Sequence, residues 1–320
     1  MFLLYWCFRK SKNEEIKLND ILANAAEEGF DELEMLSIID PTARTNALTT
    51  GEVDVMDRPD LKTASRLGQK PGIVIEETTG YLHYTFPMRT DTAPFDDNNV
   101  RMALKHAVNR EEIVEKILYG HGTVGNDHPI APSVAYHAAN LEQRHYDPDK
   151  AKFYAKKAGG INVKLSAADA AFAGAVDAAT LYKEHAAAAG IEIEVVREPN
   201  DGYWSNVWMK KAWGACYWGG RPTQDWMFTT AYQGGGSWND TFWAHTRFDE
   251  LLISARAETD SEKRRAMYFE MQQIVKDEGG VVVPMFANNV WAASDKIAHG
   301  SMAQNWTMDG NKFMEKWWFA

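Results

Sequence analysis

Short apolar runs alternate with amphipathic helical stretches along most of this chain. The runs at 73–78, 81–86, 191–196 and 281–286 have the length and residue types of strands, and the first two are expected side by side around a glycine turn. Helices are expected at 13–30, at 98–119 with a break at Asn109, at 168–189, and at 261–277 with Ser261 as the N-cap. Elements of both kinds must bury an apolar face, and they do so by stacking as layers. The alternation therefore predicts an α/β fold, and 320 residues are enough for two domains.

The formal net charge is -11, and the basic residues are scattered instead of forming a run. An acidic surface repels phosphate groups, which argues against nucleic acid or an anionic membrane as a partner. The two cysteines, Cys7 and Cys216, are far apart and form no metal-binding or disulfide pattern. The apolar run at 2–8 is too short to span a bilayer and no basic residue precedes it, so no signal peptide is recognisable.

Seven stretches of the sequence occur in an order that is typical of one protein family. They are NALTTGEVD at 46–54, PFDDNNVRMAL with AVNREEIV at 94–114, YDPDKAK at 146–152, GIEI at 190–193, YWGG at 217–220, FDELL at 248–252, and the span from MY at 267 to VPMF at 286. Each stretch alone is a weak signal. Together, over roughly residues 40–320, they resemble the ABC-transporter solute-binding proteins of family 5, the peptide- and nickel-binding family.

This resemblance implies an α/β fold of two lobes, of the periplasmic-binding-protein type (class II), which closes on its ligand by a hinge motion. Three regions are expected: an atypical N-terminal segment at 1–12, lobe one at 13–88 plus 286–320, and lobe two at 89–285. The strands that cross between the lobes are expected to end near Pro87 and to span 281–286.

Full members of the family begin with a signal peptide, a first strand of lobe one and a small extra domain. None of the three is recognisable here, so we expect an N-terminally truncated member. Lobe one would then expose a sheet edge and apolar surface, which predicts a homo-oligomer joined through lobe one. The resemblance also implies the solute-binding component of an ABC importer: periplasmic, partnered by an ABC permease, without a cofactor and not an enzyme.

The main candidate for ligand binding is the segment from Trp218 to Asp225. Gly219 and Gly220 allow close approach of the backbone, and Trp218 supplies a flat wall. Arg221 presents a planar fork that suits a carboxylate. In the family, members that bind peptide N-termini carry an aspartate where Arg221 stands. The charge is reversed here, so the resemblance implies a peptide-like ligand or a small molecule that presents a carboxylate instead of an amino group. The alternative is that Arg221 pairs internally with Asp225 or another carboxylate.

Four further aromatic or apolar residues are expected to line the cleft. Trp238 follows the small residues at 234–237, whereas Tyr84, Phe86 and Met88 would face the cleft from lobe one. Eleven of the twelve tryptophans lie between Trp204 and Trp318. Core packing is the simpler explanation for most of them, because tryptophan is a large core residue.

Metal binding and hydrolysis find little support in the sequence. Four histidines of one loop region are spaced by seven, nine and eight residues, which matches no metal-binding motif, so we expect solvated histidines: His121, His128, His137 and His145. No GxSxG or HExxH motif is present, and near neighbours such as His299 and Ser301 rarely act together. Two other functions stay open, a weak ester or peptide hydrolase using an open cleft and a non-functional fragment or subunit of a larger complex.

Overall fold

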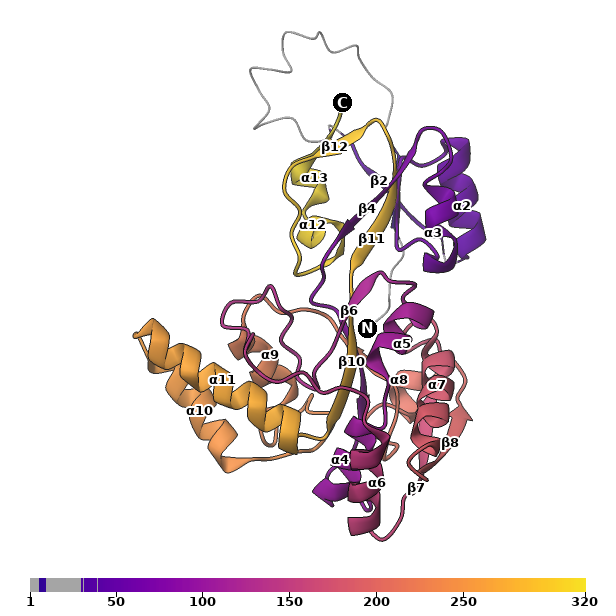
Figure 1. Cartoon of the computed structure of the whole chain (residues 1–320). Helices are drawn as coiled ribbons and strands as arrows, with labels where there is room; N and C mark the ends of the chain where they lie inside the picture. Colours follow the sequence, from indigo (N-terminus) through magenta and orange to yellow (C-terminus); the bar gives the residue numbers. More distant parts are fainter. Residues whose placement is uncertain (1–5, 10–29, 31, 39) are drawn as a thin grey trace. The chain divides into compact units, whose positions relative to one another are not determined.

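The computed structural model describes residues 6–9, 30, 32–38 and 40–320, and the chain forms two compact units (Figure 1). Unit 1 contains the described residues up to Gly80 together with Asn288–Ala320, and unit 2 is the continuous segment Tyr81–Ala287. The chain therefore passes between the units twice, after Gly80 and after Ala287. The helix expected at 13–30 lies outside the described residues, apart from its last position.

Unit 1 is built on an antiparallel sheet with the strand order β2-β1-β3-β11-β4. Its strands are β1 (Trp6–Arg9), β2 (Glu34–Ser37), β3 (Val55–Asp57), β4 (Ile73–Thr78) and β11 (Asn289–Ser294). Part of the N-terminal segment thus forms a strand between β2 and β3. The strand that joins β3 to β4 comes from the C-terminal part of the chain.

Both faces of this sheet are covered (Figure 1). On one face lie α2 (Pro41–Thr50) and α3 (Leu61–Leu67); on the other lie the short turn α12 (Thr307–Asn311), α13 (Phe313–Lys316), and the strand pair β12 (Ile297–His299) and β13 (Trp317–Phe319). Alternation along β11 explains the two faces, because successive side chains of a strand point to opposite sides. Ala292 packs with Leu48 beneath α2, whereas Trp291 packs with Phe313 and Trp317.

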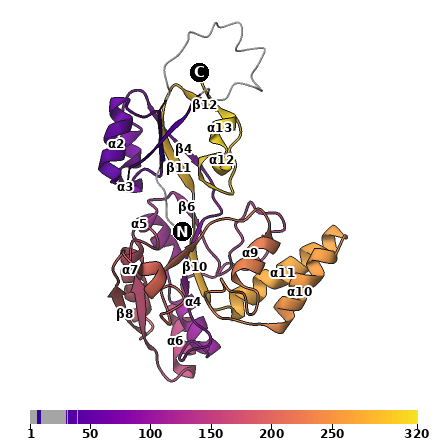
Figure 2. The same ribbon diagram turned by 180° about the vertical axis from the view of Figure 1, so that it is seen from behind.

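Unit 2 has three layers, with an antiparallel sheet between two sets of helices (Figure 2). The sheet has the order β6-β10-β5-β9 and consists of β5 (His83–Pro87), β6 (Gly122–Val124), β9 (Cys216–Trp218) and β10 (Val281–Ala287). One side carries α9 (Gln224–Ala231), α10 (Thr246–Ala257) and α11 (Ser261–Glu278). The other side carries α4 (Asn98–His106), α5 (Arg110–Ile117), α6 (Pro148–Lys157), α7 (Ala175–Ala187), and the parallel pair β7 (Asn162–Ala167) and β8 (Glu192–Arg197). The short helix α8 (Tyr203–Asn206) precedes β9.

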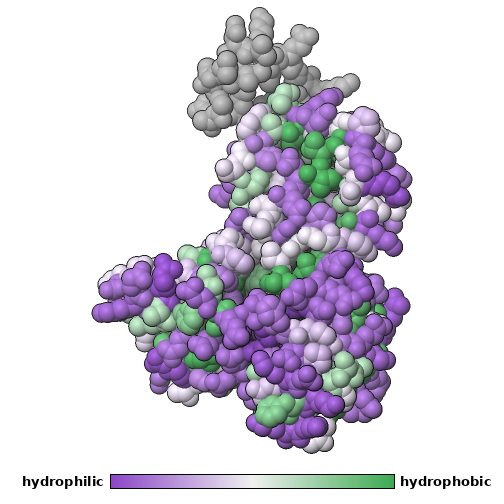
Figure 3. Space-filling model, viewed as in Figure 1, coloured by the Kyte–Doolittle hydropathy of each residue, from purple (hydrophilic) through white to green (hydrophobic). Residues whose placement is uncertain are grey.

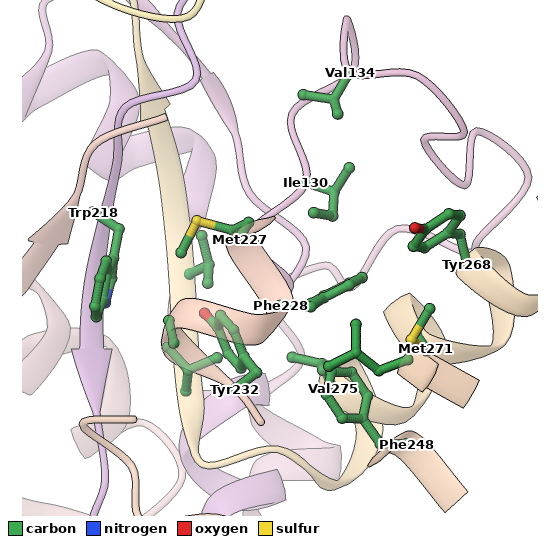
Figure 4. Close-up of a cluster of buried hydrophobic side chains, with 14 of the residues drawn as sticks. Ile130, Val134, Trp218, Met227, Phe228, Tyr232, Phe248, Tyr268, Met271 and Val275 are labelled. Carbon is green, nitrogen blue, oxygen red and sulfur yellow. The ribbon is translucent and has the colours of Figure 1, made fainter. Parts of the chain in front are cut away.

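An apolar cluster fills the space between the sheet of unit 2 and the helices α9 to α11 (Figure 4). Trp218 lies at one end beside the sheet, and Tyr268 and Met271 reach the cluster from α11 at the other end. Phe228 of α9 is fully buried between them and meets Phe248 edge to face, with ring centres 5.2 Å apart. Burying one such side chain stabilises the fold by about 1.5–3 kcal/mol, so this cluster anchors α9 against the sheet.

Three helix boundaries show where local signals succeed and fail. Asn109 separates α4 from α5 as expected, and its side chain caps α5 by accepting from the Glu112 N–H. The helix expected at 168–189 begins only at Ala175, directly after Gly174 takes a left-handed φ of 81°. The N-cap of α11 is Asp260 and not Ser261, because the Asp260 carboxylate accepts from two backbone N–H groups of the first turn.

One expected strand pairing is not found. The strands at 73–78 and 81–86 were expected side by side around a glycine turn, but they belong to different sheets. β4 pairs with β11 in unit 1, whereas β5 pairs with β10 and β9 in unit 2. The two strands expected to cross between the lobes, β5 and β10, therefore pair with each other inside unit 2.

A buried ionic cluster ties the segment after β6 to α5 and α11. Asp127 is fully buried and accepts hydrogen bonds of 2.7 Å from Arg110 Nη2 and from Arg144 Nη1. The Val283 N–H donates to the same carboxylate at 3.0 Å. Burial alone would raise the pKa of Asp127, but the charges of Arg110 and Arg144 outweigh burial and lower it to about 2. This carboxylate is therefore ionised and joins three parts of unit 2.

Polar and charged side chains cover most of the visible face of unit 2 (Figure 3). Within the described part of the chain, no helix is both long enough and apolar enough to cross a membrane. A few large apolar side chains of unit 2 stay exposed, and Trp238 is one of them, at 47%. Its surroundings form the site described next.

Candidate functional site

A pocket of about 350 Å³ opens in unit 2 beside α9. Its walls come from the turn before α9, from α9 itself and from the loop after it: Arg221, Thr229, Thr230, Gly236, Ser237 and Trp238. Arg221 and Trp238 were both predicted from the sequence as ligand-binding residues. The fold brings these two side chains to one pocket.

The loop that carries Trp238 is fixed by Asn239. The side-chain amide of Asn239 donates to the carbonyl oxygens of Gln233 (3.1 Å) and Trp243 (2.7 Å). Its Oδ1 accepts from the Thr241 hydroxyl at 2.8 Å. Gly235 has a φ of 73°, a conformation that a side chain would strain. These features fix the conformation of the loop and therefore the position of the Trp238 backbone.

Arg221 is a partly buried cation at the entrance to α9. Its Nη1 donates to the carbonyl oxygens of Gly219 (2.8 Å) and Gly220 (3.1 Å), and its guanidinium carbon lies 5.8 Å from the Trp226 ring centre. Burial lowers the pKa of Arg221, yet arginine stays charged at neutral pH. No carboxylate of the described residues forms an ion pair with it. The guanidinium is therefore available to an anion in the pocket.

Trp238 rests on two other indoles. Its ring centre lies 5.9 Å from that of Trp208 and 6.1 Å from that of Trp218, and the latter two are 6.4 Å apart. The planes are tilted or perpendicular, which suits the charge distribution of aromatic rings and stabilises each pair by about 0.5–1.5 kcal/mol. Trp208 and Trp218 thus support the wall that Trp238 gives to the pocket.

Asp240 holds both supporting indoles. Its side chain is buried, and Oδ2 accepts from Nε1 of Trp208 (3.1 Å) and from Nε1 of Trp218 (3.2 Å). Burial raises the pKa of Asp240 to about 6, and the two indole N–H groups offset only part of that rise. No pattern in the sequence selects this residue.

The structure gives different roles to the other residues of the predicted segment. Trp218 is 5% exposed and supports the wall without lining the pocket. Gly219 and Gly220 contribute the carbonyl oxygens that hold Arg221. Asp225 pairs with Arg256, with Nε and Oδ1 2.6 Å apart, and not with Arg221. The alternative in which Asp225 neutralises Arg221 is therefore not the arrangement found.

Tyr84, Phe86 and Met88 require a correction. They were expected to face a cleft from lobe one, but they lie on or just after β5, in unit 2. Phe86 and Met88 are fully buried, and Tyr84 stacks on Phe172 with ring centres 4.2 Å apart. The reason is that β5 is an interior strand of the sheet, covered on both faces, so Phe86 and Met88 belong to the core.

The histidines also differ from expectation. His128 was expected in solvent, but it is buried, and burial lowers its pKa to about 3. His137 is partly buried beside it, whereas His145 is largely exposed. No three or more His, Cys, Asp or Glu side chains of the described residues are grouped to hold a metal ion. His299 contacts the Gly300 carbonyl oxygen and Glu76 instead of a serine.

Sequence reasoning missed the hydroxyl groups of the pocket and Asp240. Thr229 and Thr230 read as ordinary residues of a helix surface, and Ser237 was noted only as part of a flexible run. The one usable signal is the small-residue run at 234–237, which predicts a tight loop next to a large aromatic side chain. Nothing marks Asp240, because aspartate is seldom buried without a cationic partner.

Comparison with known proteins adds the following matches. Residues 5–240 match the family model described as "Bacterial extracellular solute-binding proteins, family 5 Middle". The dipeptide-binding protein of Escherichia coli (strain K12) is 27% identical over 265 residues, which cover 76% of this chain and 48% of that protein. The nickel-binding periplasmic protein of the same organism is 35% identical over 126 residues, covering 38% of this chain and 24% of that protein. This chain spans about half the length of the curated relatives it matches.

The fold has a counterpart among solved structures. The periplasmic binding protein DppA from Helicobacter pylori, in complex with the peptide STSA, superimposes with a TM-score of 0.78 at 21% identity. The match covers 92% of this chain and 58% of that chain. The prediction of a two-lobed α/β fold of the periplasmic-binding-protein type is confirmed. These three proteins are named as binding proteins and not as enzymes.

Proposed function

The chain belongs to the bacterial extracellular solute-binding proteins of family 5, and on that premise we propose that it captures a small organic acid or a peptide through its carboxylate. Capture takes place without turnover, as the relatives are binding proteins. The observation that carries the proposal is Arg221. It is a partly buried cation that lacks a carboxylate partner among the described residues and lines a pocket beside an exposed indole.

The chemistry of the pocket suits a carboxylate. A guanidinium presents parallel N–H donors to the two oxygens of a carboxylate, and such charge-assisted bonds are stronger than neutral ones. The hydroxyl groups of Thr229, Thr230 and Ser237 add neutral donors and acceptors around the same space. About 350 Å³ lies within the usual range for small-ligand sites. A cation and an aromatic wall favour an organic acid over a metal ion.

The relatives agree with a peptide as one form of the ligand. One of them is a dipeptide-binding protein, and the solved structure of similar fold holds a peptide. Every unmodified peptide ends in a carboxylate, which is the group that Arg221 would bind. An arginine at this position gives no acceptor for a peptide amino group, so the carboxylate end is the one proposed to enter the pocket.

Transport by an ABC importer is the wider part of the proposal. The chain passes twice between the two units, after Gly80 and after Ala287, and these two connecting segments are the proposed hinge. Closure of the units on a bound ligand would present a closed form to an ABC permease. A periplasmic location follows from the same family membership, as the name of the nickel-binding relative states for that protein.

The test compares a peptide acid with its amide. Intrinsic tryptophan fluorescence follows titration of the protein with acetyl-Ala-Phe and with its C-terminal amide, because four tryptophans lie at or near the pocket: Trp208, Trp218, Trp226 and Trp238. The acid should bind more tightly than the amide. Arg221→Ala should weaken the acid by about 10- to 150-fold, which corresponds to roughly 1.5–3 kcal/mol. Arg221→Lys should recover only part of that loss, since an ammonium group cannot form a bidentate fork.

Arg247 supplies the matched control. It lies on α10 and pairs with Glu270 of α11, and neither residue lines the pocket. Arg247→Ala should leave the affinity for the acid unchanged. Equal affinity of the wild type for acid and amide, or an Arg221→Ala variant that binds as well as the wild type, would contradict the proposal.

A homo-oligomer joined through lobe one stays a separate proposal. In unit 1, β2 and β4 are the outermost strands of the described sheet, and an outermost strand is where a second chain can add to a sheet. Light scattering over a range of protein concentrations tests this directly. Deleting residues 1–10 is a poor test, because it would remove β1 from between β2 and β3. A monomer at every concentration would contradict the proposal.

A further inference from the structure

The carboxylate of Asp240 is unusual among the buried charges of unit 2, because all of its side-chain partners are neutral. Its Oδ2 accepts from Trp208 and Trp218, and no Lys, Arg or His of the described residues forms an ion pair with it. The titratable groups that face it are the Cys216 thiol from β9, which also forms a hydrogen bond with the carboxylate, and the Tyr232 hydroxyl after α9. Burial raises the pKa of both groups well above their usual values, so both are neutral and neither balances the charge.

Such an arrangement lowers the stability of the fold, so a functional reason for it is expected. A buried charge without a counter-ion is rare in proteins, and neutral donors such as two indole N–H groups and a thiol repay only part of its lost hydration. An asparagine would offer the same oxygen acceptor without that cost. The ionised carboxylate makes stronger hydrogen bonds than a neutral oxygen, so its advantage lies in how firmly it holds the two indoles.

The held indoles lead directly to the pocket. Trp208 follows α8, and Trp218 is the last residue of β9. The hydrogen bonds from both indoles to Asp240 Oδ2 therefore connect the segment after α8 to β9. Trp238 packs on both indoles. It is the one aromatic side chain among the described residues that line the pocket. The orientation of Trp238 therefore depends on rings whose N–H groups both end on Asp240.

We propose that Asp240 is a positioning residue of the ligand site: by fixing Trp208 and Trp218 it holds the ring of Trp238 as a rigid wall, so that the site prefers carboxylates attached to a flat, aromatic group. The inference rests on the proposed function, because it concerns the selectivity of the same pocket. Asp240 itself is buried behind the indoles and does not line the pocket.

The proposal makes selectivity dependent on pH. Above about pH 6 Asp240 is ionised and grips both indoles, and below it the protonated carboxyl holds them more weakly. Benzoate and cyclohexanecarboxylate are matched probes, since they have the same charge and a similar size but differ in planarity. A fixed aromatic wall should favour benzoate by about 2- to 10-fold, the usual strength of one aromatic pair.

The experiment measures the affinity of both acids for the whole chain at pH 7.5 and at pH 5.2, and the tryptophan emission of the free protein over the same range. The wild type should prefer benzoate at pH 7.5 and lose most of that preference at pH 5.2. Its emission should change with a midpoint near pH 6. In Asp240→Asn the emission step near pH 6 should be absent, and the preference should no longer depend on pH. Arg221→Ala, in contrast, should weaken both acids equally.

Each outcome decides between roles. A preference for benzoate that is the same in Asp240→Ala and the wild type overturns the proposal, as does an emission step that persists in Asp240→Asn. An equal loss of both acids in Asp240→Asn would show a purely structural role and overturn it too. If the wild type binds neither acid, the proposed function fails, and the ligand-free emission of wild type and Asp240→Asn alone decides whether Asp240 controls the indoles. Should Asp240→Ala not fold, the asparagine variant carries the test.

Discussion

Unit 2 buries two aspartates in opposite ways. Asp127 lies between two arginines, and their charges lower its pKa to about 2 despite burial. Asp240 lies between two indoles, and burial raises its pKa to about 6. Both side chains are almost fully buried, so depth does not explain the difference. The partners do, because the two cations beside Asp127 repay its lost hydration, whereas the neutral donors beside Asp240 repay only part.

The comparison separates a structural charge from a functional candidate. The Asp127 cluster links α5, α11 and β10, and none of its residues lines the pocket. Burial destabilises the ionised form of Asp240, yet this side chain holds the two indoles that support the wall of the pocket. A group that is kept at a cost is a better candidate for function than one that the fold fully satisfies.

The largest effect is expected from Asp127→Asn. The change leaves the buried guanidinium groups of Arg110 and Arg144 without their counter-ion, which typically costs about 3–5 kcal/mol. Urea unfolding at pH 7 measures the loss, with Asp201→Asn at an exposed position as the control. The folded pKa of Asp127 is depressed, so its stabilisation should be present above pH 4 and disappear as the pH falls towards 2. A loss below 1 kcal/mol at pH 7 would remove the contrast between the two aspartates.

A change in stability of the opposite sign is expected from Asp240→Asn, which should stabilise the fold at pH 7. The folded pKa of Asp240 is raised, so the folded state binds a proton more tightly than the unfolded chain between about pH 4 and pH 6. Stability of the wild type should therefore fall as the pH rises through that window, by up to ~3 kcal/mol. Asparagine removes the penalty, so the variant should be more stable than the wild type at pH 7 and equal to it below pH 4. Urea unfolding at both pH values checks this, and a variant that is less stable at pH 7 would show that the ionised carboxylate stabilises the fold.

The smallest effect sharpens the role of the indoles. Trp208→Phe keeps an aromatic ring but removes one of the two N–H donors to Asp240, so the pKa of Asp240 should rise further. One hydrogen bond to a charged group is worth about 1.5 kcal/mol, hence the emission midpoint should move up by about one pH unit. Trp204→Phe is the matched control, since Trp204 packs on Trp208 without a hydrogen bond to Asp240 among those of the described residues. The same midpoint in both variants would mean that the indole N–H groups do not control Asp240.

Much of the fold could be predicted from the sequence because its signals are local. Asn109 caps a helix within three residues of itself, and alternation along 191–196 is a property of six neighbouring residues. Strand pairing is different, since β11 inserts between β3 and β4 from more than two hundred residues away. No local pattern carries that information, and the same limit made 73–78 and 81–86 look like neighbours in one sheet.

The candidate site could be predicted only by chemical type. Arginine beside two glycines and tryptophan after small residues were selected for what they can bind, and the fold brings Arg221 and Trp238 together. Burial could not be predicted in the same way. Phe86 and His128 became core because of the strands and helices packed over them, and Asp240 is defined by indoles that lie up to thirty-two positions away.

The order of strands in unit 1 has a consequence for synthesis of the chain on the ribosome. Unit 2 is one uninterrupted segment whose two ends meet, since the Ala287 N–H donates to the Leu82 carbonyl oxygen at 2.8 Å. It can complete its core as soon as β10 has emerged, as domains generally fold as units. Unit 1 has to wait, because β3 and β4 have no common neighbour until β11 is made. The strands of unit 1 that precede unit 2 in the chain therefore complete their sheet only after unit 2 has folded, and during that interval β3 and β4 are the strands that a chaperone would need to shield.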